Sequence, residues 1–316
     1  MATDKHRPDE EWRSILAKPL NLSRFLPLSS IVELEVGARS DSGRALAHNT
    51  DHYLAVRLGR VQHILATSLA PDDLPDDFEE YGYSLLVADG LGEQSAGARA
   101  SRVALSAVAH LAIQFGKWNI RLGPETPAEI IEQAEFFYQR VNKAVHDASR
   151  EDDRLSGMAV SMTSVYIAGV DLFFAHVGHT KAFLFRDGAL IHLTTDHTLR
   201  QEELDLPGPK PLAGSKLDGG HVVTESLGSR GGGPNVEIEH IQLWSNDRIL
   251  LCTNGLTDVV ADDRIADVLA LRRHPNDDCQ RLVDEALAAG GPDNITVVLA
   301  DYRIRPSTTY AETAVP

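Results

Sequence analysis

The chain has 316 residues, of which 43% are hydrophobic, and a formal net charge of −16. This acidic surplus argues against nucleic acid as the main partner, because phosphate backbones are bound by clustered Lys and Arg. The chain has no apolar run of about 20 residues that could span a bilayer and no apolar signal-peptide core. Cys252 and Cys279 are its only cysteines. We therefore expect a cytoplasmic protein without a membrane partner or disulfide framework.

In chain order we expect a lead-in at 1–30, one domain at 31–303 and a polar tail at 304–316, since strand and helix signals interleave without a linker. The predicted elements are a strand at 85–88, helices at 98–114 and from 126 to about 145, strands at 164–167, 172–176, 182–185, 190–193 and 249–252, helices at 265–271 and 279–289, and a strand at 295–300. Asp187-Gly188 between apolar runs is a strong hairpin signal. Hairpins outnumber strand–helix–strand units, so the predicted fold class is α/β, layered, with largely antiparallel sheets and helices outside them.

Two irregular segments interrupt this pattern. Residues 61–81 form an acidic insertion, which we interpret as a surface hairpin; the alternative is a docking site for a basic partner. Residues 204–235 are rich in Gly and Pro. A segment of that length predicts either a flap beside a site or a surface excursion.

Aspartates stand where apolar runs end. Asp89 follows the strand at 85–88, Asp258 follows the strand at 249–252, and Asp293 precedes the last strand. An Asp-Gly or Asn-Gly pair on its own is most often a turn. Carboxylates at adjacent strand ends can also converge on a hard cation such as Mg²⁺ or Mn²⁺, which prefers oxygen ligands. The set as a whole therefore predicts a divalent-metal site.

These aspartates belong to an ordered series of motifs. The motifs are Ser-Asp-Ser-Gly (40–43), Asn-Thr-Asp (49–51), Val-Ala-Asp-Gly-Leu-Gly (87–92), Met-Thr-Ser-Val (162–165), Val-Gly-His-Thr-Lys-Ala-Phe (177–183), Leu-Thr-Thr-Asp-His-Thr-Leu (193–199), Leu-Leu-Cys-Thr-Asn-Gly-Leu-Thr-Asp (250–258) and Gly-Gly-Pro-Asp-Asn-Ile-Thr-Val (290–297). In this order the series resembles the metal-dependent protein phosphatase family, also called type 2C, over roughly 36–302. The resemblance implies a central β-sandwich of two antiparallel sheets flanked by α-helices. It also implies hydrolysis of phosphoserine and phosphothreonine in proteins with Mg²⁺ or Mn²⁺.

The resemblance further implies roles for individual residues. Asp89 is expected to bridge two metals, and Asp51 to orient the water that attacks phosphorus, so both are candidate catalytic residues. The Gly90 carbonyl is expected to ligate the second metal and Asp293 the first. Asp258 is expected to lie in the outer shell of the metal site.

The sequence departs from the family pattern at positions that all belong to the site. Thr50 stands where the family has a glutamate, Asn254 where it has an aspartate, and His179 where it has the aspartate of a third metal site. The arginine that binds substrate phosphate in the family falls at Leu46, and Arg44 is the candidate substitute.

These departures remove three carboxylates, so we expect fewer or weaker metal sites than is usual for the family. Asn254 still offers a carbonyl oxygen as a ligand. His179 is a ligand for a softer ion, a positive charge in place of a cation, or a polar residue that ends a strand. His197 is expected to support the hydrogen bonding of its loop.

Two functions remain open. The first is a metal-dependent protein serine/threonine phosphatase with reduced activity. The second is a catalytically inactive pseudophosphatase that binds a phosphoprotein or another partner. The partners implied are phosphoserine and phosphothreonine proteins and a cognate Ser/Thr kinase, and the cofactor implied is Mg²⁺ or Mn²⁺.

Overall fold

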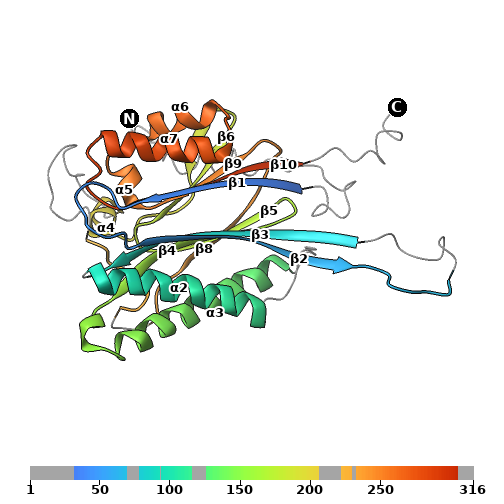
Figure 1. Cartoon of the computed structure of the whole chain (residues 1–316), viewed down its shortest axis with the longest axis horizontal. Coiled ribbons are helices and arrows are strands. Elements are labelled where there is room, and N and C mark those ends of the chain that lie inside the picture. Colours follow the sequence, from blue (N-terminus) through green and yellow to red (C-terminus); the bar gives the residue numbers. More distant parts are fainter. Residues whose placement is uncertain are drawn as a thin grey trace, which may run out of the picture.

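The computed structural model describes residues 32–69, 78–92, 94–115, 126–205, 222–229 and 233–304. The predicted lead-in and nearly all of the predicted tail lie outside these residues, as do 70–77 of the acidic insertion and 206–221 and 230–232 of the predicted flap. Two five-stranded sheets pack face to face, and helices cover the outer face of each (Figure 1). This confirms the predicted β-sandwich flanked by α-helices.

All strand pairs within the two sheets are antiparallel. The first sheet, in the order β1-β10-β9-β6-β7, contains β1 (Val32–Asp41), β6 (Lys181–Arg186), β7 (Ala189–His192), β9 (Arg248–Cys252) and β10 (Ile295–Ile304). The second sheet, in the order β2-β3-β4-β5-β8, contains β2 (Asp51–Gln62), β3 (Phe78–Leu91), β4 (Ala159–Ala168), β5 (Asp171–Val177) and β8 (Glu237–Gln242).

The helices form the two outer layers. Helices α2 (Gln94–Phe115) and α3 (Thr126–Ser149) cover the second sheet, and α6 (Asp262–Ala270) and α7 (Pro275–Ala288) cover the first (Figure 1). The short helical segments are η3 (Asp153–Leu155), α4 (Leu199–Asp205) and α5 (Asn254–Thr257). Of the described helices, none is both long enough and apolar enough to cross a membrane.

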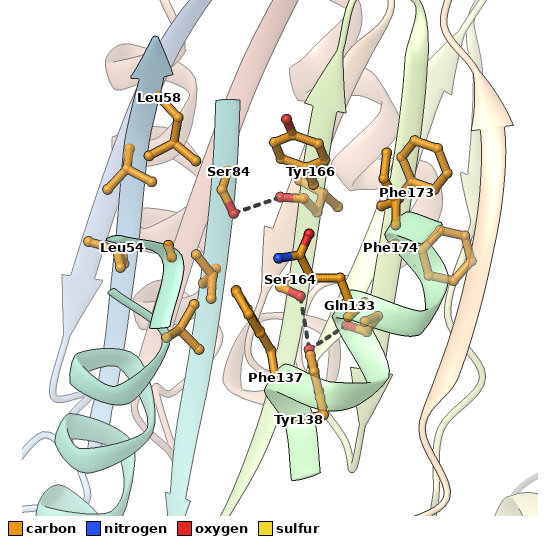
Figure 2. Close-up of a pocket in the computed structure, with 18 of the residues that line it drawn as sticks. Leu54, Leu58, Ser84, Gln133, Phe137, Tyr138, Ser164, Tyr166, Phe173 and Phe174 are labelled. Carbon is orange, nitrogen blue, oxygen red and sulfur yellow. Dashed lines mark hydrogen bonds between the residues drawn. The ribbon is translucent and has the colours of Figure 1, made fainter. Parts of the chain in front are cut away.

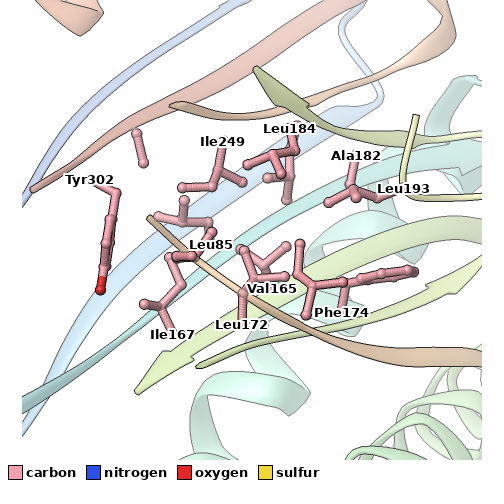
Figure 3. Packing of buried hydrophobic residues seen from close by; sticks show 14 of the residues in the cluster. Leu85, Val165, Ile167, Leu172, Phe174, Ala182, Leu184, Leu193, Ile249 and Tyr302 are labelled. Atoms are coloured by element: carbon pink, nitrogen blue, oxygen red, sulfur yellow. The ribbon is translucent and has the colours of Figure 1, made fainter. Parts of the chain in front are cut away.

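The inner strands are apolar on both faces because each face meets another layer. Along β3, Leu85 and Val87 enter the core between the sheets, whereas Leu86 and Ala88 enter the core under α2 and α3. Side chains alternate between the two faces of a strand, so a strand covered on both sides has a continuous apolar sequence. Figure 3 shows the core between the sheets, where Leu85 and Val165 face Ile249 and Leu184.

Three strands, β1, β2 and β8, are not predicted by the sequence analysis. Each lies at the edge of its sheet. Their sequences mix polar with apolar residues, as in Glu-Ile-Glu-His-Ile-Gln of β8, and they lack the apolar run that marks the inner strands. The β2–β3 pairing continues to Gln62 opposite Phe78. The described ends of the acidic insertion therefore extend this hairpin, in agreement with the interpretation of 61–81 as a surface hairpin.

An apolar cavity of about 130 Å³ lies between the second sheet and helices α2 and α3 (Figure 2). At its edge the buried Tyr138 hydroxyl donates a hydrogen bond to the Ala175 carbonyl, 2.6 Å away, and lies 3.0 Å from the Ser164 hydroxyl. These contacts satisfy the one polar atom of the Tyr138 side chain and fix α3 against the sheet.

Arg248 anchors the helices of the first sheet. Its side chain is fully buried and ion-paired with Asp278 of α7, 2.8 Å away, and with Asp301 of β10. It also donates to the carbonyl of Leu269 in α6 at 2.7 Å. A buried guanidinium with this many acceptors joins four elements at one point. Its loss would leave two buried carboxylates without their main cationic partner.

We therefore expect Arg248→Ala to lower the free energy of unfolding by about 3–5 kcal/mol, measured by urea denaturation. Arg264→Ala is the matched control, because Arg264 also pairs with a carboxylate, Glu285 at 2.6 Å, but its side chain is 47% exposed. That variant should lose much less stability than Arg248→Ala, because a solvent-exposed ion pair contributes little. Equal losses in the two variants would contradict the anchoring role of Arg248.

Candidate metal centre

The centre of the site is a pair of aspartates on neighbouring strands. Asp51, the first residue of β2, lies directly opposite Asp89 of β3 in the antiparallel register. The prediction that Asp89-Gly90 follows the end of a strand is wrong, because β3 continues to Leu91 and pairs with β4 on its other side. An inner strand needs no turn at this position, and its ladder on both sides fixes the backbone of Asp89.

Asp51 is buried, and only one of its carboxylate oxygens is satisfied. Its Oδ2 atom accepts a hydrogen bond from the Thr253 hydroxyl at 2.7 Å, while Oδ1 has no hydrogen-bond partner within the described residues. Burial and the negative charge of Asp89 raise the pKa of Asp51 well above its ordinary value, although the hydrogen bond from Thr253 acts in the opposite direction. Beside a second carboxylate, this oxygen requires either a proton shared with Asp89 or a cation.

The pKa of Asp89 is raised for similar reasons. Burial, followed by the charge of Asp293, raises the pKa of the Asp89 carboxyl to about 6. The charge of Asp258 acts in the same direction, whereas a hydrogen bond from the Asp51 carboxyl, when that group is protonated, and the charge of His179 lower the pKa. Poor hydration and neighbouring carboxylates thus raise the pKa of both Asp51 and Asp89, and a divalent cation would relieve this repulsion.

The predicted ligands open onto a common cleft of about 280 Å³. The residues that line it are Leu46, His48, Thr50, Asp89, Gly90, Leu91, Gly92, His179, Val223, Asn254 and Asp293. The cleft therefore brings together five of the predicted metal-site residues from four separate parts of the chain. It also includes Val223 from the described part of the predicted flap.

Close backbone packing requires a glycine at position 90. A Cβ atom at Gly90 would lie 2.0 Å from the carbonyl oxygen of Gly97, which is near the start of α2. A Cβ atom at Gly97 would lie 2.3 Å from the Gly90 carbonyl oxygen in turn. Only glycine allows this approach, so the N-terminal turns of α2 lie against the floor of the cleft.

Asn254 and Asp258 occupy the short helix α5 and its end, directly after β9. The Asn254 side-chain NH₂ donates to Asp258 at 3.0 Å. This bond orients Asn254 in the cleft and leaves its amide oxygen as the ligand atom it can offer. Asp258 is not among the residues that line the cleft, and its role in the outer shell of a metal stays a prediction.

Asn294 organises the loop between β1 and β2, a role that the sequence analysis missed. Its Oδ1 accepts from the Thr50 N–H at 2.8 Å and from the Thr50 hydroxyl at 2.9 Å. Its NH₂ donates to the carbonyl of Ser42 at 2.9 Å. The buried Asn294 thereby holds Thr50 at the edge of the cleft, and the only signal in the sequence is its place beside Asp293.

His179 lies beside a fixed positive charge. Its Nε2 is 3.3 Å from Asp196, and the Lys181 Nζ is 2.5 Å from both oxygens of the same carboxylate. Burial raises the pKa of Asp196, but the hydrogen bond from His179 and the charge of Lys181 outweigh it and hold that pKa well below its ordinary value. The sequence analysis did not single out Lys181 or Asp196.

Arg44 does not line the cleft. It is exposed in the loop after β1, and its backbone N–H donates to the Gly291 carbonyl at 2.7 Å. Leu46 from the same loop does line the cleft. The role of Arg44 in binding substrate phosphate stays a prediction.

A second cluster, of His176, His197 and Glu237, places three potential ligand atoms within 4.8 Å of one another. His176 is nevertheless fully engaged, because Nδ1 is 2.8 Å from the Thr163 hydroxyl and Nε2 is 3.0 Å from the Gly178 carbonyl. Burial lowers the pKa of His176 to about 3, so it is neutral. His197 accepts from the Gly178 N–H at 3.3 Å, which agrees with its predicted role in the loop.

In the described part of the chain no other trio of His, Cys, Asp or Glu side chains is as close. Asp51, Asp89 and Asp293 are therefore spaced more widely than three ligands closed around one ion. The unsatisfied Asp51 oxygen and the raised pKa of Asp89 still fit a hard dication. The residues that would hold it are Asp89, Asp293 and the Gly90 carbonyl, with Asn254 as a neutral ligand.

Comparisons with known proteins identify relatives of this site. The model of the protein phosphatase 2C family matches residues 62–289. The chain is 28% identical over 269 residues to the serine/threonine protein phosphatase PstP of Mycobacterium tuberculosis; the match covers 85% of this chain but 45% of PstP, so the chain spans about half the length of that relative. It is 27% identical over 222 residues to the serine/threonine phosphatase stp of Listeria welshimeri, with coverage of 70% and 84%.

Solved structures give the same result. The crystal structure of the M. tuberculosis phosphatase PstP/Ppp aligns with a TM-score of 0.66 and 27% identity, covering 85% of this chain and 98% of that one. The catalytic domain of PstP in complex with 2 manganese ions aligns with a TM-score of 0.65 and 27% identity, covering 86% and 99%.

The raised pKa of Asp89 predicts how the metal-free protein responds to pH. A carboxyl with a folded-state pKa of about 6 binds its proton more tightly in the folded than in the unfolded chain. The free energy of unfolding should therefore fall as pH rises from about 4 to about 6, and stay low above that. Asp89→Asn removes this penalty and should stabilise the metal-free protein at pH 7.5 by roughly 2–3 kcal/mol.

Urea denaturation in the presence of a chelator at pH 4.5 and pH 7.5 measures this effect. The exposed Asp284, which accepts from Gln280 at 2.9 Å, supplies the control variant Asp284→Asn, whose pH dependence should match the wild type. If Asp89→Asn also matches the wild type at both pH values, Asp89 is not the source of the repulsion.

Proposed function

The chain belongs to the protein phosphatase 2C family, and from this premise we propose that it is a metal-dependent phosphatase acting on phosphoserine and phosphothreonine in proteins. The observation that carries the proposal is the pair of the buried Asp51 and the half-buried Asp89 on adjacent strands, with one Asp51 oxygen that has no hydrogen-bond partner among the described residues. A poorly hydrated carboxylate pair of this kind costs stability without a cation, and it provides the ligands that hard dications prefer.

A bound Mg²⁺ or Mn²⁺ supplies Lewis acidity and an acidified water in such a site. The residues of this chain position the reaction. The Thr253 hydroxyl fixes one oxygen of Asp51 and leaves the other to orient the attacking water. Asp89, Asp293 and the Gly90 carbonyl would hold the cation, and the backbone contact between Gly90 and Gly97 keeps that carbonyl in place.

Fewer or weaker metal sites form the second part of the proposal. Thr50 and Asn254 line the cleft without charge. His179 and Lys181 share the carboxylate of Asp196, so that carboxylate is already neutralised by side chains of the protein. A fixed ammonium group beside the cleft repels an additional dication and replaces part of its charge.

The same residues support an alternative from a different class, a pseudophosphatase that binds a phosphoprotein without hydrolysing it. The supporting observation is the ion pair of Lys181 with Asp196, 2.5 Å long, on the side of the cleft where His179 replaces an acidic residue. A cognate Ser/Thr kinase as a partner stays a prediction in either case.

Titration of the wild-type protein with Mn²⁺ and with Mg²⁺ should show binding by calorimetry and metal-dependent release of phosphate from a phosphothreonine peptide. Asp293→Asn should lower both the metal affinity and the rate by at least roughly 100-fold, because it removes a ligand charge. Asp284→Asn should behave as the wild type. A folded protein that neither binds metal nor releases phosphate would be a pseudophosphatase.

Restoring charge tests the weaker-site proposal. Thr50→Glu with Asn254→Asp should raise the Mn²⁺ affinity and the phosphatase rate together, by roughly 10- to 100-fold in affinity. The control variant Thr67→Glu with Asn276→Asp adds the same charge at exposed positions outside the cleft and should change neither. If the cleft variant leaves affinity and rate unchanged, Thr50 and Asn254 are not ligand positions.

A further inference from the structure

A second hollow of about 740 Å³ runs between strand β2 and the outer face of helix α2. We call it the β2–α2 groove. Its lining residues are His52, Tyr53, Leu54, Arg99, Arg102, Val103, Leu105, Ser106, Ala107, Ala109 and His110. Within the described part of the chain, this lining contains two arginines and two histidines and no acidic residue.

Helix α2 is unusual in charge for this protein. The chain carries 46 acidic residues and a net charge of −16, yet α2 contains no Asp or Glu. Its exposed positions Arg99, Arg102, Ser106 and His110 follow one another at helical spacing and form one row. Within the described ranges, neither arginine of this row forms an ion pair. Among the residues that the structure describes, the row is therefore a stretch of positive charge without an acidic partner.

His52 lines the groove but contributes little positive charge. Burial and the charge of Arg102 lower its pKa, so the imidazole is mainly neutral near pH 7. Its Nδ1 is 2.9 Å from the Ser101 hydroxyl. The positive charge of the groove thus comes mainly from Arg99 and Arg102.

Strand β2 supplies the other wall. It lies at the edge of its sheet, with β3 as its only partner among the described strands. An edge strand offers backbone N–H and C=O groups to an extended segment, which can add to the sheet. Tyr53 on this strand is 42% exposed and provides an apolar surface for such a segment.

The β2–α2 groove and the metal cleft are lined by neighbouring residues of one chain segment. Thr50 lines the cleft and His52 lines the groove, two residues further along the chain. The Ser101 hydroxyl of α2 donates to the Thr50 carbonyl at 2.6 Å. Along α2, the row from Arg99 to His110 spans roughly 16 Å, the length of about five extended residues.

We propose that the β2–α2 groove binds an acidic segment of the phosphorylated substrate, on one side of the phosphorylated residue. The proposal rests on the proposed phosphatase function and adds the substrate class: phosphopeptides with Glu or Asp about three to seven positions from the phosphorylated residue. Charge complementarity favours this occupant, because Arg99 and Arg102 pair with carboxylates while the edge of β2 holds the backbone. A long polyanion such as nucleic acid is disfavoured by the net charge of −16.

The test compares two phosphothreonine peptides that differ only in having Glu or Gln at these positions, with the Glu residues placed before or after the phosphothreonine. The wild-type protein should have a higher kcat/KM for the Glu peptide. Arg99→Gln with Arg102→Gln should reduce that preference roughly three- to twentyfold at low salt, since each exposed ion pair contributes modestly. Arg140→Gln with Arg150→Gln removes the same charge from one exposed position in α3 and one directly after it, and should leave the preference unchanged.

Two further measurements separate the phosphatase proposal from the groove proposal. They are hydrolysis of p-nitrophenyl phosphate and binding of a labelled, unphosphorylated Glu peptide. If no phosphate ester is hydrolysed, the proposed function fails, while fluorescence anisotropy with the labelled peptide still tests the groove. Loss of Glu-peptide binding in the α2 variant alone supports the proposal. Equal kcat/KM for both peptides in the wild type, equal loss in both arginine variants, or tighter binding of a single-stranded oligonucleotide of equal charge would overturn it.

Discussion

The site depends on one constraint, the crowding of mutually repelling and poorly hydrated carboxylates at a position set by strand register. The β2–β3 ladder places Asp51 opposite Asp89, and the loop before β10 adds Asp293. Removal from water raises the free energy of each charged form, and proximity raises it further. The packing of the sandwich must outweigh this cost in the metal-free chain. A bound dication would remove it, so the arrangement that destabilises the metal-free protein is also the source of its metal affinity.

Helix α2 connects this constraint to the surface. Its N-terminal turns lie against Gly90 at the floor of the cleft, and Ser101 contacts the chain just before Asp51. The same helix carries the arginine row outward from the cleft. A segment that pairs with β2 and contacts α2 would therefore touch the two elements that position the metal ligands. The proposed β2–α2 binding groove and the metal cleft are neighbours because helix α2 contributes to both.

The residues that depart from the family pattern take part in local hydrogen-bond and ion-pair networks. Where acidic ligands are missing, the protein has Asn254 hydrogen-bonded to Asp258 on one side of the cleft and the pair of His179 and Lys181 around Asp196 on the other. Each substitution is built into a satisfied local network, which keeps the cleft folded with less negative charge. If the proposal of fewer or weaker metal sites holds, side chains of the protein supply part of the charge balance that bound cations would otherwise supply.

The sequence by itself determined the inner strands, because a strand covered on both faces has a continuous apolar run, and the hairpin at Asp187-Gly188, because that pair favours the turn. The order of its motifs also identified Asp51, Asp89 and Asp293. Only the tertiary structure decided what depends on residues far apart in the chain. Such features are the edge strands β1, β2 and β8, the unsatisfied oxygen of Asp51, the contact of Lys181 with Asp196, and the meeting of His52 with Arg99 and Arg102 in one groove. Periodicity is a local property of the sequence, whereas register and packing join segments that no local pattern relates.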